Sequence, residues 1–127
     1  MENYKEVSLQ DLKKWIDEKK DFVLIDVLVQ NSYDAQHIPG AVHAGVHEDD
    51  FLEKVLKFVP DKNKQVVVYC SSSTCQASPL AAGKLVEAGY MNVLHFKGGL
   101  ADWQDAGYAF EGGVTEIKIE GKCNCCS

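Results

Sequence analysis

Apolar residues recur along the chain at two spacings, which predict alternating helices and strands. Apolar residues three and four positions apart predict helices at residues 9–19, 48–59, 76–88 and 100–106. Nearly unbroken apolar runs predict buried strands at residues 22–27 and 65–69, and further strands are predicted at 92–96 and, more briefly, at 41–43. Because strands and helices alternate, we expect an α/β fold with a parallel sheet wrapped by helices.

Capping and turn-forming residues mark the ends of these elements. Ser8 is placed to cap the first helix, and Asp11 follows three residues later as a capping partner. Pro60 and Gly89 stand where the second and third helices should end. The polar stretch at residues 31–36 shows neither spacing, so no element is assigned to it.

Length and composition indicate one packed domain, which we place at residues 1–120. The chain has 127 residues, of which 46% are hydrophobic and 25% charged, the usual balance of a globular domain. Val114, Ile117 and Ile119 suggest a short last strand. Residues 121–127 are expected to form a mobile tail rich in cysteine.

The charge distribution and the lack of long apolar runs exclude several classes of partner. A net charge of -6 with dispersed lysines argues against binding to nucleic acid or to an anionic membrane. No window approaches the roughly 20 apolar residues of a membrane-spanning helix, and residues 1–11 lack the apolar run of a signal peptide. We therefore expect a cytoplasmic monomer or weak dimer whose five cysteines are reduced.

Cys70 follows directly on the strongest predicted strand, residues 65–69. Ligands of parallel α/β sheets bind beyond the carboxyl ends of the strands, so this position singles out Cys70. The next five residues are small, and they let the backbone present several N–H groups as an anion nest before a helix N-terminus: Ser71, Ser72, Ser73, Thr74 and Cys75. A cysteine in such a setting commonly has a pKa below the free value of about 8.5. The alternative is an inert buried thiol, which would not require a polar loop.

Four segments, taken together and in this order, resemble the single-domain rhodanese family. They are residues 24–27 (LIDV), 37–42 (HIPGAV), 67–70 (VVYC) and 98–103 (GGLADW). The resemblance covers about residues 5 to 111. It implies a three-layer fold with a five-stranded, mainly parallel sheet and helices on both faces.

The resemblance also implies a sulfurtransferase reaction. Cys70 would take sulfane sulfur from a small donor as a persulfide and pass it to a thiophilic acceptor, namely cyanide, a thiol or a partner protein. The substrate-binding loop would comprise Ser71, Ser72, Ser73, Thr74, Cys75 and Gln76. Asp26 would be structural, tying backbone near the loop, because a buried carboxylate is tolerated only when it is hydrogen-bonded or paired. We expect no cofactor and no metal ion.

The chain departs from the family pattern at two places. Many rhodanese loops carry basic residues, whereas residues 71–76 are uncharged here, and Leu28 stands where an arginine is common. A neutral loop steers a doubly charged donor less strongly. We therefore expect polysulfide or a persulfide to be preferred over thiosulfate.

Cys75 occupies a position where the family often has arginine. If the loop curls as in the family, the Cys75 sulfur could resolve the persulfide, releasing sulfide and leaving a disulfide with Cys70. Alternatively, Cys75 points into the protein and only fills space. A disulfide requires Cα atoms within about 7 Å, and the sequence leaves both interpretations open.

Other cysteines and histidines give weaker signals. Cys123, Cys125 and Cys126 could bind a soft metal, relay sulfur or have no function, but they lack the fourth ligand of a structural zinc site. The histidines at residues 37, 43 and 47 are interpreted as solvated or hydrogen-bonding, and His95 as structural.

Two other functions compete with sulfur transfer. A cysteine phosphatase or arsenate reductase needs an arginine six residues after the cysteine, and Gln76 stands there. A rhodanese-like module without catalysis, or a thiol redox sensor that uses Cys70 and Cys75, remains as the alternative function.

Overall fold

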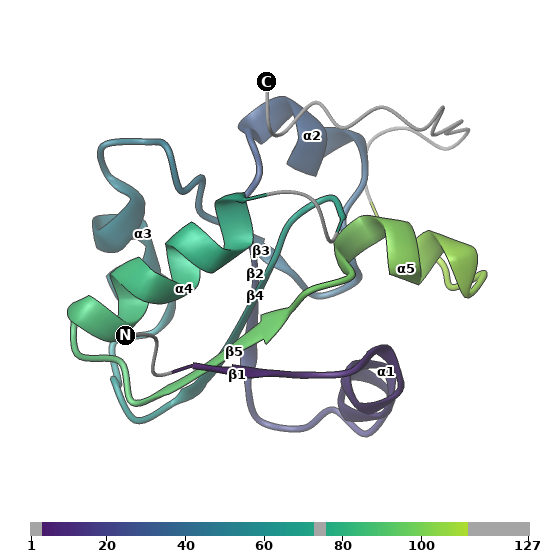
Figure 1. Cartoon of the computed structure of the whole chain (residues 1–127), viewed down its shortest axis with the longest axis horizontal. Helices are drawn as coiled ribbons and strands as arrows, with labels where there is room; N and C mark the ends of the chain where they lie inside the picture. The colour runs from purple at the N-terminus through teal and green to yellow at the C-terminus, as the bar shows by residue number, and fades with distance from the viewer. Residues whose placement is uncertain (1–3, 73–75, 112–127) are drawn as a thin grey trace.

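The computed structural model describes residues 4–72 and 76–111, in which five parallel strands form one sheet (Figure 1). The sheet order is β1-β5-β4-β2-β3, and every neighbouring pair is parallel. The strands are β1 (Lys5–Glu6), β2 (Val23–Asp26), β3 (Val42–His43), β4 (Gln65–Tyr69) and β5 (Asn92–Phe96). The predicted parallel α/β sheet is therefore confirmed.

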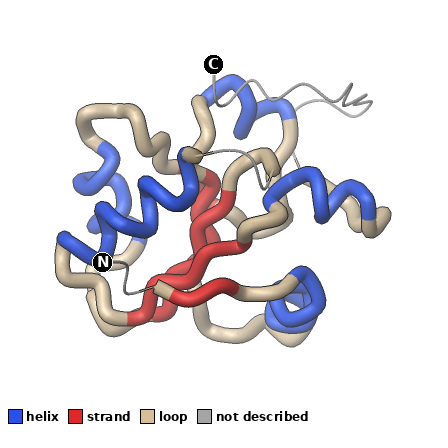
Figure 2. The backbone as a smooth tube through the Cα atoms, in the orientation of Figure 1, coloured by secondary structure: helices blue, strands red, loops and turns tan. Residues whose placement is uncertain are grey.

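Helices cover both faces of this sheet. They are α1 (Leu9–Asp17), α2 (Gln30–Ala35), α3 (Phe51–Phe58), α4 (Ala77–Glu87) and α5 (Gly99–Asp105). In Figure 1, α1 and α5 lie to one side of the strands and α3 and α4 to the other; Figure 2 shows the strands in red between them. None of the helices described is long and apolar enough to cross a membrane.

Most predicted elements are present with small differences at their ends. The bounds of β4 and β5 are those predicted. Ser8 caps α1 by accepting a hydrogen bond from the Asp11 backbone N–H at 3.1 Å. Helix α3 begins three residues later than predicted, because Glu48 belongs to a preceding turn in which its N–H donates to the Gly45 carbonyl.

Two short elements were not predicted. Helix α2 lies in the polar stretch and buries none of its residues, so it has no apolar spacing to reveal it. Strand β1 has two exposed residues, and only its pairing with β5 defines it. The predicted strand near residues 114–119 and the tail at residues 121–127 lie outside the described residues, so the domain boundary stays a prediction.

The core is densest around β4, the central strand. Val66, Val67, Val68 and Tyr69 are all completely buried, since β2 and β5 flank the strand and helices cover both faces. Because successive side chains of a strand point to opposite faces, Tyr69 and Cys70 lie on different sides of the sheet. Tyr69 contacts Asp26, whereas Cys70 contacts Ser78 of α4.

Candidate active site

The backbone of Cys70 is fixed by the start of α5. The Leu100 N–H donates to the Cys70 carbonyl at 3.0 Å, and the Ala101 N–H donates to the Ser71 carbonyl at 2.8 Å. Gly99 makes this approach possible: its φ is +59°, and a Cβ atom there would overlap the Cys70 carbonyl oxygen. Two segments far apart in sequence therefore hold the position of the cysteine.

The Cys70 sulfur is buried on the α4 side of the sheet, with a relative exposure of 0%. Its Sγ lies 3.3 Å from Ser78 Oγ, and it also lies 3.7 Å from the carbonyl oxygen of Ser72. Ser78 is the second residue of α4, so the first turn of the helix brings its hydroxyl to the sulfur. A thiolate or persulfide at Cys70 would thus have a hydroxyl donor beside it.

A second hydrogen bond extends this contact to His95. Ser78 Oγ lies 2.6 Å from His95 Nε2, and His95 is 5% exposed on β5. The Tyr4 ring meets the His95 ring edge-on, with centroids 5.9 Å apart. We call the three side chains Cys70, Ser78 and His95 the sulfur chain.

Sequence reasoning missed the part of the sulfur chain beyond Cys70. Ser78 stood among small residues of a predicted helix, and His95 was interpreted as structural. The available signal was that a polar side chain occurs in each of two apolar elements next to Cys70. The contact between Ser78 and His95 is seen only in the structure, where the register of β5 on β4 pairs His95 with Val68.

The loop after Cys70 is described only in part. Ser71 and Ser72 are half-buried, and Gln76 is exposed at the start of α4. Ser73, Thr74 and Cys75 lie outside the described residues, as do Cys123, Cys125 and Cys126. The resolving role of Cys75 and the role of the terminal cysteines therefore stay predictions.

Asp26 belongs to a separate buried network on the other face. Its Oδ1 accepts from the Leu28 N–H at 2.9 Å, and its Oδ2 accepts from the Tyr69 hydroxyl at 2.9 Å. The Tyr69 oxygen in turn accepts from the Ile38 N–H at 3.0 Å. We call Asp26, Tyr69 and these two N–H groups the carboxylate network, which links β2 and β4 to the turn before β3.

Burial dominates the ionisation of this network. It raises the pKa of Asp26 from 3.8 to about 6, although the Leu28 and Tyr69 hydrogen bonds and the nearby histidines His43 and His37 oppose it. Burial also raises the pKa of Tyr69 well above its usual value, with the Asp26 charge adding to the effect. Tyr69 therefore keeps its proton and remains a donor to Asp26.

The histidines near β3 make separate local contacts. His43 Nε2 lies 2.7 Å from the Leu28 carbonyl oxygen, and His37 Nδ1 lies 2.8 Å from the Tyr33 carbonyl oxygen, with its ring stacked on Tyr33. His47 is exposed. Within residues 4–72 and 76–111, no group of three or more histidine, cysteine or acidic side chains is placed to hold a metal ion.

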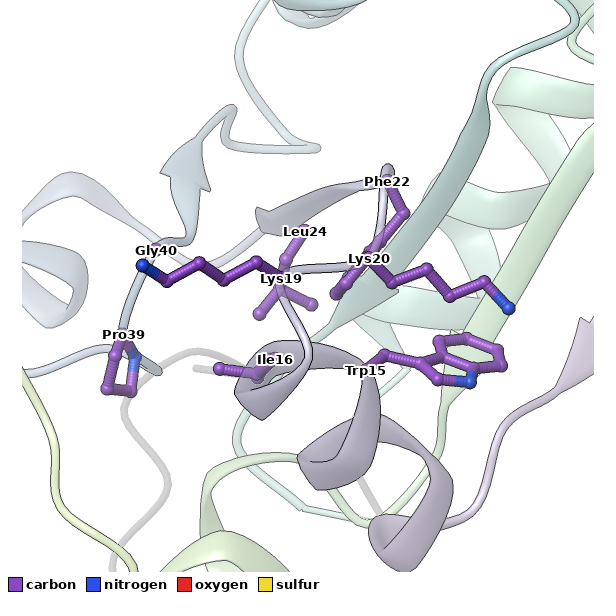
Figure 3. Close-up of a pocket in the computed structure, with 8 residues that line it drawn as sticks. All are labelled: Trp15, Ile16, Lys19, Lys20, Phe22, Leu24, Pro39 and Gly40. Atoms are coloured by element: carbon purple, nitrogen blue, oxygen red, sulfur yellow. The ribbon is translucent and has the colours of Figure 1, made fainter.

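A surface pocket lies elsewhere, between α1 and the turn at Pro39 and Gly40 (Figure 3). Its lining includes Ile16 and Leu24, and the Lys20 ammonium lies 4.6 Å from the centre of the Trp15 ring. Figure 3 shows the Lys19 side chain extended towards Gly40. Neither Cys70 nor α4 contributes to this pocket, so we assign it no part in the chemistry of Cys70.

Comparisons with known proteins place the chain in a family. Residues 8–106 match the model of the rhodanese-like domain. The chain is 35% identical over 103 residues to "Thiosulfate sulfurtransferase GlpE" of Coxiella burnetii (strain RSA 331 / Henzerling II), covering 80% of this chain and 88% of that relative. It is 28% identical over 98 residues to "Putative sulfur carrier protein YrkF" of Bacillus subtilis (strain 168), covering 77% of this chain and 50% of YrkF.

A solved structure shares the fold. The BH2092 protein from Bacillus halodurans superposes with a TM-score of 0.77 at 26% identity, covering 85% of this chain and 77% of that one. The match to the family model extends from the start of α1 to the end of α5 and includes the whole sulfur chain and Asp26. The chain therefore belongs to the family of rhodanese-like domains.

Proposed function

We propose that this protein is a sulfurtransferase that carries sulfane sulfur on Cys70 as a persulfide. The observation that carries the proposal is the buried Cys70 sulfur at the carboxyl end of β4, with the Ser78 hydroxyl at 3.3 Å. Membership of the rhodanese-like family and the 35% identity to a relative named as a thiosulfate sulfurtransferase support it.

The reaction has two displacement steps at sulfur. In the first, the Cys70 thiolate attacks the sulfane sulfur of the donor, a new S–S bond forms at Cys70, and the donor leaves with the electron pair of its broken bond. In the second, a thiolate or cyanide acceptor attacks the outer sulfur of the persulfide. The bond to Cys70 then breaks, and its electron pair returns to the Cys70 sulfur as thiolate.

The donor we propose is polysulfide or a persulfide in preference to thiosulfate. Positions 71–76 of the chain carry no charged residue, so the loop offers a dianion little electrostatic attraction. A thiol, cyanide or protein acceptor is compatible with the second step, because each presents a thiophilic nucleophile.

Mass spectrometry of the intact, reduced protein tests the proposal. The protein is incubated separately with polysulfide and with thiosulfate, and the Cys70 peptide is then examined. We expect the mass of one additional sulfur atom on Cys70, formed faster with polysulfide. Cys70→Ser should give no adduct at this position, and Cys75→Ser should still accept sulfur, which separates carriage from resolution.

The same experiment tests the alternative function. A redox sensor would give no sulfur adduct with either donor, and peroxide would produce a disulfide between Cys70 and Cys75. A rhodanese-like module without catalysis would give neither product. Full sulfur transfer by Cys70→Ser would overturn the proposed mechanism.

A further inference from the structure

We propose that Ser78 and His95 form a proton relay that converts the Cys70 thiol into its thiolate and then stabilises that anion. Ser78 touches the reacting sulfur and acts directly, whereas His95 acts through Ser78 as a positioning residue. This inference rests on the proposed function, because the thiolate is the nucleophile and the leaving group of sulfur transfer. It concerns residues outside the loop, since Ser78 comes from α4 and His95 from β5.

The geometry allows two consistent arrangements of protons in the sulfur chain. A serine hydroxyl has one proton to donate and two lone pairs that can accept. In the thiol state, Cys70 donates to Ser78 Oγ and the Ser78 hydroxyl donates to His95 Nε2. In the thiolate state, His95 Nε2–H donates to Ser78 Oγ and the Ser78 hydroxyl donates to the sulfur. The distances of 3.3 Å and 2.6 Å suit both arrangements.

One step interconverts the two arrangements. The Cys70 S–H bond breaks and its electron pair stays on sulfur, while the proton passes to Ser78 Oγ. At the same time, the proton of the Ser78 hydroxyl passes to His95 Nε2. The result is a thiolate, an intact serine and an imidazolium ion, with no change in total charge and no external acid or base.

Burial makes this arrangement more effective than it would be at the surface. Cys70, Ser78 and His95 have relative exposures of 0%, 1% and 5%, so water cannot readily replace the hydrogen bonds between them. An imidazolium ion two hydrogen bonds away lowers the cost of a buried thiolate, because opposite charges attract strongly in a medium of low dielectric constant. The thiolate is also the leaving group of the second step, so the same contact favours release of sulfur.

Other titratable residues lie beside His95. Tyr4, directly before β1, meets the imidazole edge-on with its ring, and Glu6 of β1 pairs with His95 in register and is exposed. From α4, the contact is Ser78 itself. Ser78 contacts both the Cys70 sulfur and His95 Nε2, so it is a route by which His95 reaches that sulfur.

The test measures alkylation of Cys70 by iodoacetamide in the full chain as a function of pH, read on the Cys70 peptide by mass spectrometry. Ser78→Ala removes the bridge. His95→Gln keeps an amide that can donate a hydrogen bond to Ser78 but cannot accept and hold the proton. In both variants we expect alkylation near pH 7 to slow about tenfold and its midpoint to rise by about one pH unit.

Two matched controls separate the relay from general effects of burial. His43→Gln changes another buried histidine, whose ring contacts the Leu28 carbonyl, and Ser32→Ala changes a half-buried serine of α2. Both should keep the wild-type alkylation profile. A wild-type profile in either Ser78→Ala or His95→Gln overturns the relay, and rescue by glutamine in particular would show that His95 acts only as a structural donor.

A measurement on the wild-type protein avoids any dependence on how the variants fold. The ring signals of His95 are followed by NMR during a pH titration, before and after Cys70 has been alkylated. We expect the midpoint of the His95 titration to fall after alkylation, because the thiolate that stabilises the imidazolium is gone. An unchanged midpoint overturns the relay. Neither experiment uses a sulfur donor, so failure of sulfur transfer and failure of the relay are distinguished.

Discussion

Two buried polar groupings begin at neighbouring residues, Tyr69 and Cys70, and extend to opposite faces of the sheet. In the carboxylate network, Asp26 and Tyr69 are matched to backbone N–H groups that cannot change protonation. In the sulfur chain, three side chains follow one another, and a proton can occupy either end. The difference indicates that hydrogen bonds to backbone hold structure, whereas a chain of titratable side chains is suited to chemistry.

The largest effect is expected when the nucleophile is removed and the fold is kept. Cys70→Ser should lower sulfur transfer by about a thousandfold or more, because the nucleophile itself is lost. The free energy of unfolding should change little, since serine has nearly the same shape. Steady-state transfer from polysulfide to a thiol, together with urea denaturation, measures both quantities. If the variant unfolded at a much lower urea concentration, Cys70 would also contribute to the stability of the fold.

Gly99→Ala should affect both groupings, because α5 fixes the backbone that they share. The new Cβ would overlap the Cys70 carbonyl, and φ at this residue is +59°. We expect a loss of about 4 kcal/mol in the free energy of unfolding, measured with urea, and slower sulfur transfer.

Gly107→Ala is the matched control for that change. Its φ is +79°, but a Cβ there would meet nothing within 4 Å. The free energy of unfolding should fall by only about 1 kcal/mol, because only the backbone conformation is unfavourable for alanine. Equal losses in the two variants would show that the contact with Cys70 contributes nothing.

The carboxylate network should make stability depend on pH. The pKa of Asp26 is about 6 in the folded protein and near 3.8 when exposed, so between these values the folded state holds the extra proton. The stabilising contribution is therefore complete below about pH 4 and is lost as the pH rises through 6, by roughly 3 kcal/mol. Urea denaturation at several pH values should show this slope of unfolding free energy against pH, and Asp26→Asn should remove it. An identical slope in the variant would contradict the assignment.

Among the substitutions within the two groupings, Tyr69→Phe should have the smallest effect. The change leaves an oxygen of Asp26 and the Ile38 N–H without their partner, which should cost about 2 kcal/mol of unfolding free energy. Sulfur transfer should stay within about twofold of wild type, because Tyr69 points away from the sulfur chain. Urea denaturation and a transfer assay on the same sample measure the contrast. A large loss of activity with unchanged stability would reverse the roles given to the two faces.

The sequence predicted best what depends on local pattern. β4 and β5 were found with their bounds because each is a short run with β-branched or aromatic residues that ends close to turn-forming residues, which favours a strand. The α2 helix escaped because it has six residues and buries none of them. Cys70 was singled out as the candidate nucleophile because it directly follows the strongest predicted strand.

The rest of the candidate site depends on packing between distant segments. Ser78 and His95 are 17 residues apart, and they meet only because α4 packs on β5 and β5 pairs with β4 in one particular register. Neither fact follows from spacing. The arrangement around Asp26 has the same origin, since Tyr69 and Asp26 are 43 residues apart. Sequence reasoning supplied a role for Asp26 through family resemblance, but it supplied no partners.

The hydrogen bonds from Leu100 and Ala101 determine when the site can be completed as the chain is synthesised. Cys70, Ser78 and His95 leave the ribosome before the segment that fixes the Cys70 carbonyl does. A nascent chain that ends before Gly99 thus contains every side chain of the sulfur chain but lacks the backbone contacts that hold the cysteine. Completion of the site therefore waits for α5, the last helix described, so the protein should acquire its reactivity towards sulfur donors only after α5 has been synthesised.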